Sequence, residues 1–178
     1  MQNIENNINI LLGDNVFSKY NWKQTIYKDD LKNVILNGLL VAILGGILAG
    51  LVDYAFQLLN LVISIGLLLL CYLIAFRVKK AYTSYHILYP VLAIVFLIIG
   101  LFFKQVSYYF CLMPDVKTFS LLIDGGFYLS FILSPFQYLI SAFKSFNIYT
   151  LLIGIIDLII YILAFIYTYR FTKGRNWL

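Results

Sequence analysis

The stretch VILNGLLVAILGGILAGLV, residues 34–52, decides the class of this protein, because it contains nineteen consecutive residues without a charge. A helix needs about 20 apolar residues to cross a bilayer core about 30 Å thick. Three more stretches of similar length follow at residues 56–76, 86–103 and 148–169, the last interrupted only by Asp157. The chain is therefore expected to be an all-α integral membrane protein with a bundle of four transmembrane helices.

The composition of the chain supports the same conclusion. Of its 178 residues, 62% are hydrophobic and 12% are charged, whereas soluble domains average about 45–50% and about 25%. Eight acids and thirteen bases cannot cover the surface of a soluble domain of this size. One histidine and two cysteines leave no ligand set for a zinc or iron–sulfur centre. Soluble, disulfide-rich and metal-cluster proteins are therefore excluded.

The number of spans depends on residues 121–143, which are apolar enough to form a fifth one. Lysine and arginine concentrate on the cytoplasmic side of membrane proteins, so their placement distinguishes the two arrangements. Four spans with a cytoplasmic N-terminus put ten bases inside and three outside, whereas five spans put eight inside and five outside. Four spans are predicted, with both termini cytoplasmic and with Asp53, Tyr54 and Ala55 as a tight turn between the first two.

The outer segment, residues 104–147, carries its own helix-start signal. Ser134 can act as an N-cap, Pro135 suits the first helical position, and Gln137 lies three residues after the cap. The segment is therefore predicted to form two short helices broken near Ser134. They are expected to lie on the outer membrane face, with re-entry into the membrane as the alternative.

Residues 1–33 are predicted to form a cytoplasmic tail rather than a signal peptide, because their start carries no base and no long apolar stretch. Residues 171–178 form the second cytoplasmic tail. Between residues 16 and 32, side chains on one side of a helix indicate an amphipathic helix along the inner membrane surface. A solvated tail is the alternative. The side chains on that helix face are Phe17, Tyr20, Gln24, Tyr27 and Leu31.

Small residues form stripes along the predicted spans, and such stripes let transmembrane helices approach each other closely. In the first span Gly38, Ala42, Gly46 and Gly50 recur every four residues. In the last span small and polar residues share one face, while nearly all other positions are large and apolar. This pattern is typical of bundle packing, and a polar cavity between helices is the alternative. The last-span stripe is Thr150, Gly154, Asp157, Tyr161, Ala164 and Thr168.

Asp157 is the residue that most suggests a functional site. An acid near mid-membrane costs about 2.5–3.5 kcal/mol on insertion scales and usually faces the bundle interior. It lies about 14 Å from the outer end of its span, at the level of Gly45, Gly46 and Ser64, with Tyr161 one turn further along. No lysine or arginine is expected there, so desolvation should keep the acid largely protonated. It could be a structural hydrogen-bond donor or a proton- or cation-coupled site.

Catalytic groups do not come together in the predicted topology. An aspartyl protease needs two carboxylates about 3 Å apart, but Asp53 is expected at the outer end of its span and Asp157 several turns deeper. Cys71 and the single histidine, His86, lie at different depths on different helices, and Cys111 has no nearby base. No phosphate-binding or nucleotide motif occurs. The chain is expected not to be an enzyme and to hold no cofactor or metal.

The net charge of +5 does not indicate nucleic acid, because the bases flank the spans, where orientation and anionic headgroups explain them. The expected partners are the lipid bilayer, with anionic headgroups at the inner face, and another membrane protein or a second copy of the chain.

The order of these parts resembles a known group. The run AILGGILAGLV leads into the predicted turn, FRVKKAY lies inside, TFSLLID opens the outer segment, and a last span follows. Over residues 34–170 this order resembles small four-span membrane proteins of Gram-positive bacteria, to which no activity is assigned. The resemblance implies a location in the bacterial plasma membrane and carries no functional residue onto this chain.

The leading hypothesis is a non-enzymatic membrane protein that acts by contact, as an accessory or immunity-type subunit bound to another membrane component. It rests on the lack of a catalytic arrangement and on the aromatic outer segment. The alternative is a small transporter, or a transporter subunit, that uses Asp157 as a protonatable group within the membrane.

Overall fold

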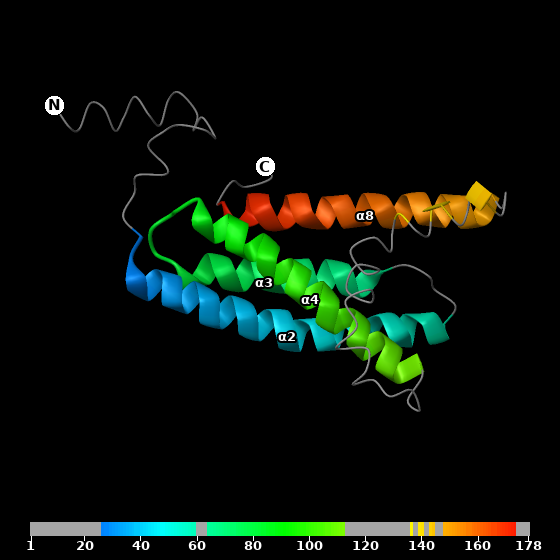
Figure 1. The fold of residues 1–178 in the computed structure, drawn as a ribbon, viewed down its shortest axis with the longest axis horizontal. Coiled ribbons are helices and arrows are strands. Elements are labelled where there is room, and N and C mark those ends of the chain that lie inside the picture. The colour runs from blue at the N-terminus through cyan, green and yellow to red at the C-terminus, as the bar shows by residue number, and fades with distance from the viewer. Residues whose placement is uncertain are drawn as a thin grey trace, which may run out of the picture.

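The computed structural model describes residues 26–59, 64–112 and 148–173, together with a few positions between 136 and 144. Within these residues the chain forms four long helices and no strand (Figure 1). Three of them are long and apolar enough to cross a membrane, over residues Lys28–Leu58, Leu88–Leu112 and Leu151–Thr172. The expected all-α class is confirmed, and these helices indicate a membrane protein. The four helices are α2 (Lys28–Leu58), α3 (Ile65–Ala81), α4 (Leu88–Leu112) and α8 (Ile148–Thr172).

The helices form three layers. α2 packs chiefly on α4 and also on α3, while α8 packs on α3 and α4. Figure 1 accordingly shows the α3–α4 pair lying between α2 and α8. The start of α2, the end of α3, the start of α4 and the end of α8 all meet at one end of the bundle. Side chains of α3 and α4 therefore face both outer helices.

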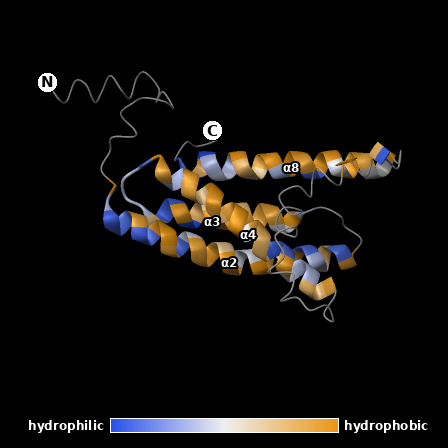
Figure 2. Cartoon of the chain, viewed as in Figure 1, coloured by the Kyte–Doolittle hydropathy of each residue, from blue (hydrophilic) through white to orange (hydrophobic). Residues whose placement is uncertain are grey.

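Most of the four helices are hydrophobic along their length (Figure 2), and many large apolar side chains are exposed on the outside of the bundle. On α8, Gly154, Ala164 and Thr168 are buried. This arrangement suits a lipid solvent, in which large aliphatic side chains gain nothing by leaving the acyl chains. The exposed α8 side chains are Ile155, Ile156, Ile159, Ile162, Leu163 and Ile166.

The glycine stripe of α2 lies against α4. A Cβ atom added to Gly46 would lie 2.5 Å from the carbonyl oxygen of Gly100, and one added to Gly50 would overlap the carbonyl oxygen of Lys104. Gly38 faces the ring of Phe96 in the same way. The missing side chains therefore set how closely α2 and α4 approach each other.

Among the described residues, seven basic side chains lie at one end of the bundle, which we call the basic end. They belong to the first turns of α2, the last turns of α3 and the end of α8. Two of them are held over aromatic rings, Lys79 over Phe171 at 4.7 Å and Lys80 over Phe76 at 4.5 Å. The seven are Lys28, Lys32, Arg77, Lys79, Lys80, Arg170 and Lys173.

The loop between α3 and α4, residues 82–87, is fastened to both outer helices at this end. Asp30 in the first turn of α2 is buried and accepts a hydrogen bond from the backbone N–H of Thr83 at 3.1 Å. The hydroxyl of Tyr82 donates to the backbone carbonyl of Thr172 at the end of α8. One loop thus ties together the outer layers, which pack on opposite sides of the α3–α4 pair.

The predicted tight turn at residues 53–55 is wrong. α2 continues through these residues to Leu58, and α3 begins only at Ile65. The prediction treated Asp53 as the end of a span because charges are costly in lipid. That cost is offset here, because Asp53 pairs with a lysine of α4.

The third predicted span, residues 86–103, also differs from its helix. α4 begins at Leu88. His86 lies before the helix, and the Nδ1 atom of His86 accepts a hydrogen bond from the backbone N–H of Leu88 at 3.1 Å. The helix then runs past Lys104 to Leu112. The last span agrees more closely, since residues 148–169 were predicted and α8 covers Ile148–Thr172.

Several predictions fall wholly or partly outside the described residues. α2 begins at Lys28 after an extended Tyr27, so a continuous helix over residues 16–32 is not formed, and residues 16–25 lie outside the description. The predicted helix start at Ser134 and most of the possible fifth span, residues 121–143, also lie outside the described residues.

Candidate functional site

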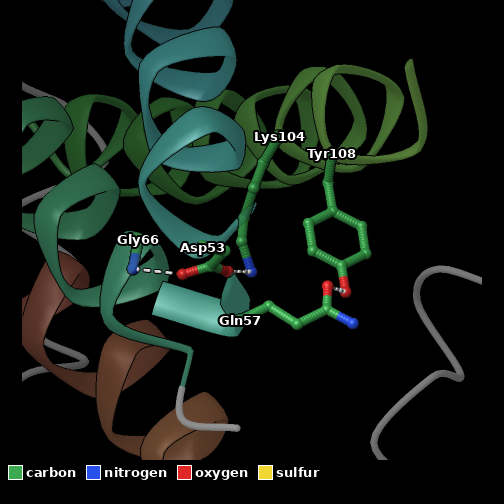
Figure 3. A network of polar contacts seen from close by, with 5 residues as sticks. All are labelled: Asp53, Gln57, Gly66, Lys104 and Tyr108. Atoms are coloured by element: carbon green, nitrogen blue, oxygen red, sulfur yellow. Dashed lines mark hydrogen bonds and ion pairs between the residues drawn. The ribbon is translucent and has the colours of Figure 1, made fainter. Parts of the chain in front are cut away.

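A buried ion pair joins α2 to α4. The Nζ atom of Lys104 lies 2.6 Å from Oδ2 of Asp53, and their side chains are only 10% and 11% exposed (Figure 3). Asp53 lies five residues before the end of α2, and Lys104 lies eight before the end of α4. At 1.5 Å per residue, the pair is about 8 to 12 Å inside the helix ends.

The second oxygen of Asp53 caps α3. Oδ1 accepts a hydrogen bond from the backbone N–H of Gly66 at 2.6 Å, in the first turn of α3, where Ser64 makes no side-chain cap of its own. A helix N-terminus carries about half a positive charge, which favours a carboxylate there. Gly66 must lack a side chain, because a Cβ atom would lie 2.8 Å from Oδ1 and overlap the carbonyl of Ala49.

Asp157 reaches the same helix start from the opposite side. A hydrogen bond from the Ser64 backbone reaches its carboxyl group, which also interacts electrostatically with Lys104 and Asp53. Its Oδ1 atom is buried and has no hydrogen-bond partner within the described part of the chain. An acid from each outer layer thus meets at the N-terminus of α3.

We call Asp53, Lys104 and Asp157 the charge cluster. If both acids are ionised, two negative charges face one ammonium group and the partial positive charge of the α3 N-terminus. If Asp157 is protonated, the remaining carboxylate and ammonium balance each other. Uncompensated charge is costly in a buried site, so gain or loss of a proton by Asp157 changes the charge balance of the whole cluster.

Two side-chain contacts brace the ion pair. The hydroxyl of Tyr108 donates to Oε1 of Gln57, as Figure 3 shows. The hydroxyl of Ser107 donates to the carbonyl oxygen of Ile47 at 3.0 Å. Both contacts join α4 to α2 within about one turn after Lys104, and their partners on α2 lie on either side of Asp53.

The residues predicted to surround Asp157 divide into two groups. Ser64 meets the acid through its backbone. Gly45 and Gly46 serve helix packing, because Gly45 faces the Leu70 side chain and Gly46 faces the α4 backbone. Tyr161 is half-buried one turn along α8, and its ring packs on Phe165 with centroids 5.1 Å apart.

Lys104 was not predicted to belong to this site. The expectation that no base acts on Asp157 is wrong, because Lys104 interacts electrostatically with it. Depth had been counted from span ends set at charged residues, but α2 and α4 both continue beyond those charges. The sequence did contain an indication of this pair, because Asp53 and Lys104 follow directly after two predicted spans and were both expected at the outer side. Because Asp53 is held by Lys104, the two acids do not form the shared-proton pair of an aspartyl protease.

Comparison of the chain with protein-family models, with curated proteins and with solved structures finds no match.

Proposed function

We propose that this protein is a small transporter, or a transporter subunit, in which Asp157 binds and releases a proton during the transport cycle. The supporting observation is the buried, unpartnered Oδ1 of Asp157 beside Asp53 and Lys104. Ionisable groups inside membrane proteins are costly and commonly mark ion or proton pathways. A carboxyl group with only a structural role would be expected to have both oxygens hydrogen-bonded.

The position of the cluster at the start of α3 supports the same proposal. Transporters commonly place their sites at helices that begin within the membrane, where the free N-terminal N–H groups face charged groups. α3 has 17 residues, about 26 Å at 1.5 Å per residue, which is shorter than the bilayer core. Its first turn lies at the cluster rather than beyond it, so protonation of Asp157 changes the charge at a helix end inside the bundle.

The proposal can be tested by a rapid pH step on vesicles of phosphatidylethanolamine and phosphatidylglycerol that contain the protein and are adsorbed on a solid support. The wild type is expected to give a transient charge displacement as Asp157 gains or loses its proton. Asp157→Asn keeps the size of the side chain and a hydrogen-bond donor, so it should fold but give no such signal. An undiminished displacement in Asp157→Asn would contradict the proposal.

A matched control is Asp29→Asn, because Asp29 is an exposed acid near the start of α2. It should give the wild-type signal. If Asp157→Asn does not fold, infrared spectroscopy of the wild type alone decides. A protonated carboxyl band from the dry interior should disappear as the pH is raised, and absence of that band at every pH would overturn the proposal.

We also propose that the chain crosses a bacterial plasma membrane four times, with the first turn of α3 inside the membrane and the basic end in the cytoplasm. The seven bases of that end support this orientation, because positive residues are retained on the cytoplasmic side. The opposite end carries fewer described bases, namely Lys104 in the ion pair with Asp53 and Lys144 shortly before α8. Exposed Lys28, Lys32 and Lys80 would then lie at the level of anionic headgroups.

Action by contact with another membrane component remains a prediction of the sequence. The outer segment on which it rested lies largely outside the described residues. The exposed faces of the described helices are mostly large and aliphatic, and such side chains suit lipid as well as a partner. Purification in mild detergent would distinguish the two functions, because a contact protein should copurify with a defined partner in stoichiometric amount.

A further inference from the structure

Lys104 is the only basic side chain among the described groups that act electrostatically on Asp157. The groups facing Asp157 come from each neighbouring element: Lys104 from α4, Asp53 from α2 and the Ser64 backbone from α3. On α8 itself, Tyr161 lies one turn away. Lys104 is thus in contact with Asp53 and acts on Asp157 through its charge.

We propose that Lys104 is a positioning residue shared between Asp53 and Asp157, and that this sharing sets the pH at which Asp157 releases its proton. The inference rests on the proposed function and deepens it. Its geometric basis is the 2.6 Å ion pair that holds Nζ of Lys104 at Asp53, in a cluster where Asp157 has an oxygen without a described partner.

The two neighbours of Asp157 act in opposite directions. The positive charge of Lys104 favours the ionised acid, because opposite charges attract, whereas the negative charge of Asp53 favours the protonated acid. Since Lys104 is already engaged by Asp53, only part of its field is available to Asp157. The ion pair thus tunes the site without receiving the proton itself.

The experiment is an infrared titration of the protein in lipid. For the wild type and for each variant, the spectrum of the same protein carrying Asp157→Asn is subtracted, which leaves the signal of Asp157. Lys104→Met removes the positive charge and should move the Asp157 midpoint to higher pH by about one unit, a roughly tenfold gain in proton affinity. Asp53→Asn removes the negative charge and should move the midpoint to lower pH by a similar amount. Asn retains an oxygen that can accept the Gly66 N–H.

Two further variants separate charge from structure. Lys104→Arg keeps the charge and should leave the midpoint near that of the wild type, while Gln105→Met changes the neighbouring side chain without removing a charge and should also leave it unchanged. If Lys104→Met fails to fold because Asp53 is then unpaired, the double variant Asp53→Asn/Lys104→Met removes both charges. Its midpoint should lie between those expected for the single changes.

Two results would contradict the inference. The first is an unchanged midpoint in Asp53→Asn, or in Lys104→Met where that variant folds. The second is a shift of both single variants in the same direction. Either outcome leaves the proposed function intact as long as Asp157 titrates. Loss of titration at Asp157 in the wild type would instead remove the proposed function and this inference together.

Discussion

Asp30 and Thr83 connect the first turn of α2 to the loop between α3 and α4 through two groups of the threonine. The backbone N–H and the hydroxyl of Thr83 both donate to Oδ2 of Asp30 at 3.1 Å. Ser84 donates to the same oxygen from its backbone N–H and its hydroxyl, each at 3.3 Å. One carboxylate therefore orders the whole turn.

Replacing Asp30 by alanine should lower the thermal unfolding midpoint in detergent by several degrees, because four donors in the turn lose their acceptor. Asp29→Ala is the matched control, since Asp29 is the adjacent exposed acid. Circular dichroism during heating measures both. Equal midpoints for the two variants would show that the turn does not depend on Asp30.

Gly46→Leu should destabilise the protein by at least about 1–3 kcal/mol, because the added side chain must displace the α4 backbone. A Cβ atom at this position already meets the Gly100 carbonyl oxygen at 2.5 Å and the Phe103 Cβ at 2.9 Å. Ile47→Leu should change little, because Ile47 is exposed next to it. The loss of stability in mild detergent is the measurement, and equal tolerance of both changes would show that α2 and α4 do not pack through Gly46.

Tyr82 should make stability depend on pH in the alkaline range. Burial, with a smaller contribution from Tyr89, raises the pKa of Tyr82 to about 12, while an unfolded tyrosine titrates near pH 10. The folded state therefore favours the neutral phenol, and this contribution is present below pH 10 and is lost as the pH rises towards 12. Unfolding midpoints measured across that range should fall less for Tyr82→Phe than for the wild type. Tyr27→Phe alters an exposed tyrosine, so the unfolding midpoint of this control variant should fall as much as that of the wild type.

The proposed orientation can be read by cysteine labelling on intact cells in a Cys71→Ala, Cys111→Ala background. Cysteine at position 117 should react with a membrane-impermeant thiol reagent, because that position follows the end of α4 opposite the basic end. Cysteine at position 173, at the basic end, should not react. Labelling at both positions would establish the five-span arrangement.

The sequence predicts the helices better than it predicts the site. Apolar length locates the spans, and the spacing of Gly46 and Gly50 indicates a face that allows close approach, because both signals are local. The ends of α2 and α4 were misplaced because a charge was taken to end a span. Whether Asp53 can stay inside the bundle depends on Lys104, which lies 51 positions away in the sequence. A contact of that range is decided by helix register, which one sequence does not give.

The ion pair between α2 and α4 also has a consequence for biogenesis. Before α4 is inserted, Asp53 has no partner at Lys104. Placing its carboxylate in the membrane alone is unfavourable, because an acid near the centre of a span costs about 2.5–3.5 kcal/mol. Insertion of α4 supplies the counter-charge for the carboxylate that caps α3. The first three helices are thus expected to assemble as a unit onto which α8 docks last. A nascent chain released after Leu112 should resist protease in the membrane better than one released after Leu59.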